Sequence, residues 1–327
     1  TAAVELLDSG ATVPFISRYR KEITGGLDDT QLRKLEERLG YLRELELRRE
    51  AVLGSILEQG KLTPELEVAI IAAETKVRLE DLYLPYKQKR RTKAQIALEA
   101  GIEPLADSLI SDPCLEPFDE ALAYINKDEK FKTAFEDAKG VLDGAKYILM
   151  ERFAEDAELL QSIRDFMSHN TVIFSNVVSG KEKDAAKYRD YFDLRDKFQG
   201  IPSHRALAML RGRREGLLQL RIDVVVPDDQ VHPCISMIGN HFEISHHDRA
   251  ADDWLAEVVS WTWRVKLQLH QETELMSAMR AAAEEAAIEV FALNIKDLLL
   301  AAPAGQKATI GLDPGLRTGV KLAVIDA

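Results

Sequence analysis

Cysteine is scarce in this sequence, and so are uninterrupted apolar runs; each shortage excludes a class of protein. The 327 residues include two cysteines, Cys114 and Cys234, which lie far apart in the chain. Such a pair cannot supply the disulfide framework of a small secreted domain or a cysteine-rich metal site, so we expect both thiols to be reduced. No stretch reaches the roughly 18–20 apolar residues of a membrane-spanning helix, and no secretory leader follows Thr1. These absences predict a cytoplasmic protein with no membrane partner, and Thr1 itself predicts a processed or truncated N-terminus.

Short motifs for catalysis and cofactor binding are also missing. The sequence contains no GxxxxGK[ST] phosphate loop, no GxSxG and no HExxH. His241, His246 and His247 lie near Asp248, but neither a cysteine pair nor a helical histidine spacing accompanies them, which favours a surface loop over a zinc site. We therefore predict that the chain is not an enzyme and that it has no cofactor and no bound metal.

An excess of positive charge is missing as well. Lys and Arg number 43 against 55 Asp and Glu, which gives a formal charge of −12. A protein that coats DNA without specificity carries net positive charge, so this class is disfavoured. Nucleic acid is still compatible with the composition, because a local basic patch acts over about one Debye length, roughly 8–10 Å. The distribution of charge therefore matters more than its sum.

Helical periodicity is what the sequence has in abundance. Leucines recur at spacings of three and four after Asp28 and Asp29, either of which can cap a long amphipathic helix that ends at Gly60. Thr63, followed by proline, starts a second helix that we expect to run to about Leu82. Further helices are expected at 94–100, 103–109, 118–170 with breaks near 126 and 140, and 181–198.

A change of pattern follows. Residues 218–226 alternate between apolar and polar side chains, which predicts a strand that faces a core on one side. A loop-rich stretch carries the histidines, and a helical pattern with at most one break then runs from about Asp252 to about Leu300. Three tryptophans in that helix are expected to pack in the core: Trp254, Trp261 and Trp263. The predicted fold class is mainly α, with a multi-helical N-terminal region and a small β element near 217–226.

The sharpest motif lies at residues 310–319, IGLDPGLRTG, between two apolar runs. Asp313 stands at the end of the first run, where a carboxylate could hold Mg²⁺ in a two-metal phosphoryl-transfer site. Asp-Pro-Gly is equally typical of the turn in a β-hairpin, and the residues by themselves favour the hairpin. A two-metal site also needs carboxylates from later strands and helices, so we expect no complete site within these 327 residues.

A basic loop at residues 87–93 follows an aromatic segment that contains Tyr83 and Tyr86. Cations in such a loop could contact a phosphate backbone while the tyrosines stack on bases. A solvated loop whose cations pair with acidic helices explains the pattern about equally well. The five cations of the loop are Lys87, Lys89, Arg90, Arg91 and Lys93.

A second cluster of arginines lies further along the chain, with glycines between its members. Guanidinium groups suit phosphate or carboxylate, so the cluster could bind nucleic acid. A structural set of salt bridges explains it at least as well. The candidate residues are Arg205, Arg211, Arg213 and Arg214.

Several of these segments together resemble the Tex family of bacterial transcription accessory proteins. The resemblance is carried by TVPFISRYRKE at residues 12–22, LYLPYK at 82–87, SHR at 203–205, RG at 211–212, and GLDPGLRTG at 311–319. It covers nearly the whole chain in order. The last segment is similar to the entry of the family's YqgF domain, which belongs to the RNase H-like class and itself resembles the RuvC resolvase.

The resemblance implies a fold, a function and partners. It implies a helical N-terminal region with a helix-turn-helix-like part at 1–190, a central helical region at 191–303, and the truncated start of a YqgF domain at 304–327. It also implies a nucleic-acid-binding factor, with RNA, DNA or both as partners and contacts with the transcription machinery. The family's helix-hairpin-helix elements and OB-fold RNA-binding domain are not expected within this sequence. Asp313 corresponds to the first metal-binding aspartate of RuvC-type nucleases.

Two other functions stay open. The strand, aspartate and turn at residues 308–319 would suit a metal-dependent nuclease or resolvase if more acidic residues joined Asp313. Long helices and net negative charge would suit a scaffold for protein partners.

Overall fold

The structure is a computed structural model that describes residues 1–88, 91–126, 131–227, 229–302, 305–315 and 319–326. The chain forms two compact units, each built from segments that are distant in sequence. Unit 1 comprises Thr1–Val172 and Asp223–Thr273, and unit 2 comprises Ile173–Ile222 and Glu274–Ala327. Helices dominate, as predicted, and the described residues contain no helix that is both long and apolar enough to span a membrane.

The N-terminal part of unit 1 is a small helical cluster. Its buried side chains are Ala3, Val13, Ile16 and Leu32. A capping box starts the third helix: Asp28 accepts a hydrogen bond from the Gln31 N–H at 2.8 Å, and the Gln31 side chain accepts from the Asp28 N–H at 3.0 Å. The predicted cap is therefore confirmed at Asp28. The helices are α1 (Ala2–Asp8), α2 (Val13–Tyr19) and α3 (Asp29–Glu58).

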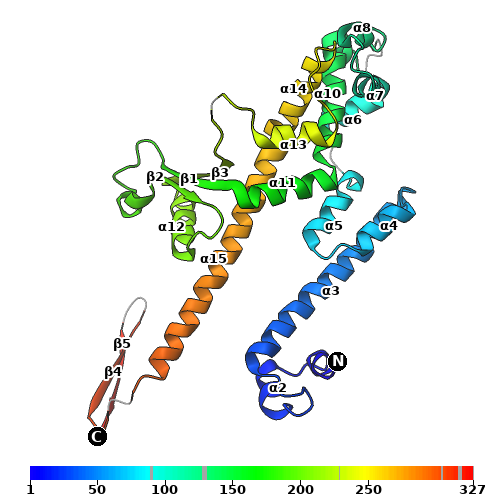
Figure 1. Cartoon of the computed structure of the whole chain (residues 1–327). Helices are drawn as coiled ribbons and strands as arrows, with labels where there is room; N and C mark the ends of the chain where they lie inside the picture. Colours follow the sequence, from blue (N-terminus) through cyan, green and yellow to red (C-terminus); the bar gives the residue numbers. More distant parts are fainter. Residues whose placement is uncertain (89–90, 127–130, 228, 303–304, 316–318, 327) are drawn as a thin grey trace. The chain divides into compact units, whose positions relative to one another are not determined.

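The far end of α3 packs against the next two helices of unit 1 (Figure 1). These are α4 (Pro64–Ile71) and α5 (Lys76–Tyr83), followed by the short 3₁₀ turn η1 (Leu84–Tyr86). Thr63 caps α4 as predicted. The prediction of one helix to about Leu82 is wrong, because Thr75 accepts a hydrogen bond from the Arg78 N–H at 3.2 Å and thereby starts a new helix after a four-residue break.

The rest of unit 1 is organised around α10, whose buried face contacts most of its neighbours. Figure 1 shows α14 beside it, and Lys146 on α10 donates to Glu257 on α14 at 2.8 Å. A buried ion pair between Arg164 and Asp81, at 2.9 Å, joins α11 to α5. The elements are α6 (Lys93–Glu99), α7 (Glu103–Ser111), α8 (Pro117–Leu122), α9 (Lys132–Phe135), α10 (Ala138–Ala154), α11 (Ala157–Asn170), α13 (Pro233–His241) and α14 (Asp252–Trp261).

Three details of this region differ from the sequence prediction. The break expected near residue 140 lies at residues 136–137, where Asp137 caps α10, and Gly140 lies within the first turn of that helix. A further break, which the sequence did not predict, comes where Asp156 caps α11. The loop expected around the histidines contains a helix, α13, since Pro233 fits its first turn.

The last long helix is interrupted once, as expected. A π-helical segment, η3 (Thr262–Leu267), separates α14 from α15 (Gln268–Leu299). Trp263 is buried, as predicted for the core, whereas Trp261 is 40% exposed.

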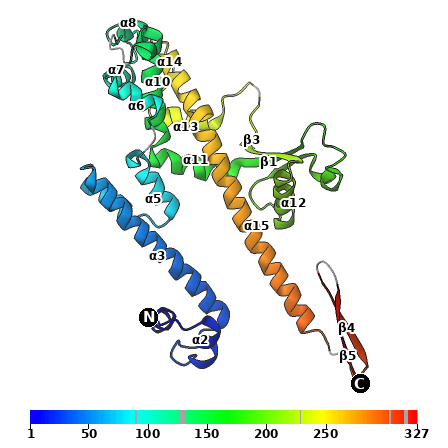
Figure 2. The same ribbon diagram turned by 180° about the vertical axis from the view of Figure 1, so that it is seen from behind.

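Unit 2 contains a three-stranded sheet in the order β2-β1-β3, with α12 beside it (Figure 2). The helix predicted at 181–198 is wrong. Residues 193–197, four of which are charged, form a short edge strand in which exposed and half-buried positions alternate. Short length and charge protect a sheet edge from further pairing. The strand predicted at 218–226 is confirmed for seven residues, and β1 was not predicted. The elements are β1 (Thr171–Val177), η2 (Ala186–Tyr191), β2 (Asp193–Lys197), α12 (Ser203–Arg214) and β3 (Leu218–Val224).

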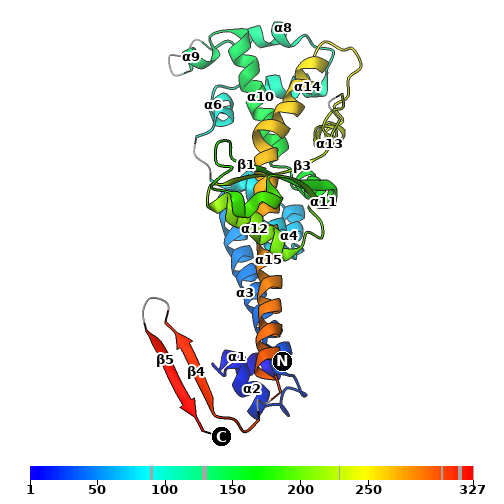
Figure 3. The same cartoon turned by 90° about the vertical axis from the view of Figure 1, so that its left-hand side faces the viewer.

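The C-terminal motif forms an antiparallel hairpin, as the residues favoured (Figure 3). Its strands are β4 (Thr309–Pro314) and β5 (Val320–Ile325). Ile310 pairs with Val324 and Leu312 with Leu322, so one face of the hairpin is apolar. All four side chains are more than 60% exposed.

Candidate nucleic-acid interface

The basic loop lies in unit 1 between η1 and α6. Lys89 and Arg90 fall outside the described residues, while Lys87, Arg91 and Lys93 are exposed. Thr92 caps α6 by accepting a hydrogen bond from the Gln95 N–H at 3.0 Å. This cap fixes the end of the loop and the start of α6.

The described cations of the loop differ in what they contact. Arg91 pairs with Glu99 at 2.7 Å. Lys93 donates to the Tyr147 hydroxyl at 3.1 Å, and its Nζ lies 4.8 Å from the centre of that ring. Lys87 has no ion-pair partner among the residues that the structure describes. Both interpretations of the loop thus find support: Arg91 pairs with an acidic helix, and Lys87 faces solvent.

A cavity of about 410 Å³ lies beside the loop, within unit 1. Tyr86 and Lys87 line it, and the Gln59 amide donates to the Tyr86 carbonyl at 2.9 Å. Its other charged side chains are of both signs: Lys61, Glu103, Glu151, Arg152 and Glu155. Because these charges partly cancel, the loop rather than the cavity supplies the positive field.

The two tyrosines before the loop are placed differently. Tyr86 is half-buried at the cavity. The Tyr83 hydroxyl lies 3.0 Å from the Ser55 hydroxyl, and the Arg48 guanidinium lies 5.3 Å from its ring centre. Tyr83 therefore packs on α3, and Tyr86 is the tyrosine that a ligand in the cavity would contact.

The arginine cluster lies in unit 2, on α12. Arg211, Arg213 and Arg214 occupy the last turn of the helix and are exposed. Cations there interact favourably with the negative end of the helix dipole, so part of their role is structural. Arg205, near the start of the helix, pairs with Asp196 at 2.8 Å. The cluster is thus divided between Arg205, which forms a salt bridge to β2, and three exposed arginines at the end of α12.

Another cationic group in unit 2 was missed at the sequence level. Arg195 on β2 and Arg221 on β3 lie on either side of Phe174 on β1, with guanidinium carbons 5.0 Å and 4.6 Å from the ring centre. The alternation at 193–197 indicates a strand and would have placed Arg195 on a sheet face, but these residues were included in a helix predicted at 181–198. The β-branched run TVIFSNV at 171–177 was the signal for the central strand.

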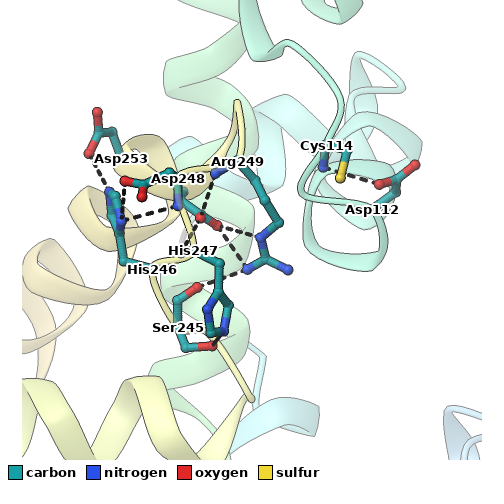
Figure 4. A network of polar contacts seen from close by, with 9 residues as sticks. Asp112, Cys114, Ser245, His246, His247, Asp248, Arg249 and Asp253 are labelled. Carbon is teal, nitrogen blue, oxygen red and sulfur yellow. Dashed lines mark hydrogen bonds and ion pairs between the residues drawn. The ribbon is translucent and has the colours of Figure 1, made fainter.

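The histidine region forms a polar network in unit 1 (Figure 4). The buried Asp252 carboxylate accepts from the His247 N–H at 2.6 Å and from the Arg249 N–H at 2.9 Å, and the Arg249 guanidinium lies 2.8 Å from it. Hydrogen bonds from that guanidinium hold the pKa of Asp252 well below its usual range. His246 lies 3.0 Å from Asp253, and that hydrogen bond raises the pKa of His246.

The hydrogen bonds of this network hold the loop that precedes α14 in place. His246 and His247 lie in a loop, as predicted. Within the described ranges, no group of three or more potential metal ligands occurs. The Ala251 N–H donates to the Pro113 carbonyl at 2.9 Å, so the loop is held against residues 112–114.

A histidine and a cysteine lie close together at the start of α13, where a nucleophile would be of interest. His232 Nε2 lies 3.0 Å from Asp223, and its Nδ1 accepts from the Cys234 backbone N–H at 3.2 Å. The histidine therefore contacts the backbone of Cys234, not its thiol. Burial, and secondly the nearby Asp223 charge, raise the pKa of Cys234 to about 12. A thiol in this state is a poor nucleophile.

The geometry defines a class of protein: a mostly helical chain whose exposed surfaces bring cationic and aromatic side chains together in each of its two units. Comparison with known proteins gives the family. A model described as Tex central region-like matches residues 112–291, and one described as Tex-like protein N-terminal domain matches residues 1–57. The chain belongs to the Tex family.

Named relatives agree with this assignment. The chain is 59% identical to protein YhgF of Escherichia coli K12 over 329 residues, covering 100% of the chain and 42% of that protein. It is 53% identical to the transcriptional accessory protein Tex of Neisseria gonorrhoeae, covering 99% of the chain and 42% of that protein. It is 28% identical to the human S1 RNA-binding domain-containing protein 1, covering 98% of the chain and 32% of that protein. The chain thus spans less than half the length of these relatives.

Proposed function

We propose that this chain is the N-terminal and central part of a Tex-like transcription accessory factor that binds nucleic acid. The observation that carries the proposal is the basic loop at 87–93, whose sequence holds five cations in a chain of net charge −12 and whose Lys87 lines a cavity together with Tyr86. Phosphate contacts supply most of the sequence-independent affinity for nucleic acid, so a local cluster is sufficient. A role in transcription implies the bacterial cytoplasm and contacts with the transcription machinery.

A helix-turn-helix-like part has a candidate next to this loop. Helices α6 and α7 are separated by three residues, and Gly101 among them has a φ of +78°. A short turn that contains glycine is typical of this motif. We place the motif at 93–111, within the proposed N-terminal region 1–190.

The proposed layout continues with a central region at 191–303 and the start of an RNase H-like domain at 304–327. The hairpin β4–β5, with Asp313 near the end of its first strand, supports the last part. Asp313 is exposed, the Lys321 ammonium lies 3.7 Å from it, and no group of three or more potential metal ligands occurs among the described residues. We therefore retain the binding function and not the enzymatic alternative.

Fluorescence anisotropy with a labelled 20-nucleotide RNA, single-stranded DNA and duplex DNA, each over a series of salt concentrations, tests the proposal. The test variant replaces the five loop cations, Lys87, Lys89, Arg90, Arg91 and Lys93, with Ala. We expect weaker binding and a smaller dependence of log K on log salt, by about 0.7–0.9 per lost phosphate contact.

A matched control removes the same charge from exposed cations elsewhere in unit 1. It replaces Arg18, Lys21, Lys34, Lys139 and Arg264 with Ala. This variant should keep most of the affinity, since its cations are dispersed. Equal losses of affinity in the two variants would mean that net charge matters and the loop does not. No loss in the loop variant would show that the loop is not a contact.

A further inference from the structure

One face of the β2-β1-β3 sheet combines an aromatic ring with cations. Positions alternate between faces along a strand, so Phe174 shares a face with Asn176 on β1, and Arg195 shares one with Lys197 on β2. The contact between Arg195 and the Phe174 ring shows that these two faces are the same one. Arg221 on β3 joins them, as its contact with the Phe174 ring shows. These side chains are exposed, apart from Phe174, which is half-buried.

The opposite face of the sheet is the one that packs inward. Ile173, Ser175, Leu218 and Leu220 are buried. The Gly212 backbone of α12 approaches Leu218 so closely that an added Cβ would lie 2.5 Å from the leucine side chain. The helix therefore covers this face, and the Phe174 face remains open to solvent.

The charge and shape of the open face select one kind of ligand. Arg195, Arg221 and Lys197 supply three positive charges, and Asp193 at the start of β2 is the one acidic residue among the outward positions 193, 195 and 197 of that strand. The guanidinium carbons of Arg195 and Arg221 lie 5.0 Å and 4.6 Å from the centre of the Phe174 ring. Bases stack on aromatic rings and on guanidinium planes, while cations contact the phosphates between them.

We infer that this face is a stacking platform for single-stranded nucleic acid, with Phe174 as the base-stacking ring and Arg195, Lys197 and Arg221 as phosphate or base contacts. The inference rests on the proposed nucleic-acid-binding function and adds a second contact surface to it. A duplex keeps its bases stacked on one another, so the platform should favour unpaired strands.

Cross-strand stabilisation is the competing explanation. A contact between an exposed cation and an aromatic ring contributes about 0.5–1 kcal/mol, so the two exposed arginines could stabilise the sheet alone. Conservative substitutions of Phe174 distinguish sheet stabilisation from base stacking. Phe174→Leu keeps an apolar side chain on the strand but removes the stacking plane, and Phe174→Tyr keeps the plane.

The test measures anisotropy of labelled oligo(U) and oligo(dT) 12-mers and of a fully paired duplex of equal length, with the whole chain. We expect the wild type to prefer the single strands, and Phe174→Leu to weaken their binding about 5- to 150-fold with little change in salt dependence. Phe174→Tyr should bind like the wild type. Arg195→Gln should reduce the salt slope by about 0.7, whereas Arg189→Gln, an exposed cation of η2, should not.

The outcomes separate this inference from the proposed function. If Phe174→Leu and Arg195→Gln bind like Arg189→Gln while the loop variant is weakened, the platform is wrong and the proposed function stands. If the wild type binds no nucleic acid, both fail. Equal affinity for duplex and single strands overturns the platform. A preference for oligo(U) over oligo(dT) assigns the platform to RNA, and equal affinity assigns it to single strands of either kind.

Thermal melts of each variant identify any loss of affinity that comes from unfolding.

Discussion

Asp252 is the most heavily hydrogen-bonded carboxylate of the histidine loop. Its side chain is 1% exposed and accepts from two backbone N–H groups and the Arg249 guanidinium. An ionised carboxylate that is held this way is stabilised in the folded state, which is why its pKa is lowered. The residue thus joins α14 to the loop that precedes it.

Replacing Asp252 with Asn should lower the melting temperature, with a characteristic pH dependence. The folded-state pKa lies below the unfolded value of about 3.9. The contribution of Asp252 is therefore complete above about pH 4 and is lost as the pH falls through the folded-state pKa. We expect the difference in unfolding free energy between wild type and Asp252→Asn to be constant from pH 5 to 7 and to shrink toward pH 3.

Asp253→Asn is the matched control, because that side chain is 97% exposed and its pairing with His246 is screened by solvent. Thermal unfolding followed by circular dichroism between pH 3 and 7 measures both variants. If the difference in unfolding free energy between wild type and Asp252→Asn stays constant down to pH 3, Asp252 does not have a lowered pKa in the folded state.

The two thiols should differ sharply in reactivity. Cys114 is exposed, whereas Cys234 is buried with a pKa raised to about 12. Native protein at pH 8 should therefore react with one equivalent of a thiol reagent such as DTNB, and unfolded protein with two. Peptide mapping should place the fast label on Cys114. Rapid native labelling of Cys234 would show that its surroundings open readily.

At the scale of elements, the space around a helical glycine shows how closely the neighbouring helices pack against it. Gly144 on α10 faces Phe135, Ile102 and Ala97, and an added Cβ would lie 2.9 Å from the Phe135 ring and 3.0 Å from the Ile102 methyl. Both neighbours are buried, so they have little room to move. Gly54 on α3 has no atom within 4 Å of such a Cβ.

Gly144→Ala should consequently destabilise unit 1 by about 1–3 kcal/mol through overpacking. Gly54→Ala should stabilise by roughly 0.5–1 kcal/mol, because alanine loses less backbone entropy in an exposed helix. Urea unfolding measures both, with the midpoint decreasing for the first variant and increasing for the second. A stabilising Gly144→Ala would mean that α6, α7 and α9 pack more loosely on α10 than the structure shows.

Elements were predictable where a local signal decides them. Asp28, Thr63 and the alternation at 218–224 each specify a cap or a strand through neighbours in sequence. The strand at 193–197 was missed because an edge strand rich in charge resembles a solvated helix in sequence, and its pairing with β1 is a long-range contact. The Arg195–Phe174–Arg221 group was not predicted either, because its members lie on three strands that are distant in sequence. The basic loop was predicted because its cations are contiguous in sequence.

At the scale of the whole molecule, chain order and spatial order differ. Unit 1 includes residues 223–273, which return to it after the segment that forms the sheet of unit 2. Lys146 and Glu257 pair across 111 positions of sequence. No periodicity or motif reveals such a return, since it depends on packing between elements. The predicted boundaries at 190 and 303 follow sequence order and stay predictions.

The hairpin β4–β5 has no buried side chain among its described residues. Its apolar face carries Ile310, Leu312, Leu322 and Val324, each more than 60% exposed, and a two-stranded hairpin alone is marginally stable in water. Its amides should therefore exchange with deuterium within seconds, and those of β1, the central strand of its sheet, far more slowly. Hydrogen exchange read by mass spectrometry on peptic peptides measures both.

A pair of substitutions tests the same point energetically. Leu312→Ser with Leu322→Ser should change the unfolding free energy of the chain by less than about 0.5 kcal/mol, because both side chains already face solvent. Leu220→Ser in β3, where the side chain is 6% exposed, should cost about 2–5 kcal/mol by leaving a cavity and a buried hydroxyl. Slow exchange in the hairpin together with a large cost of the double variant would mean that its apolar face is covered in solution. The apolar face would then be a contact surface in its own right, since nothing on the hairpin itself could protect it.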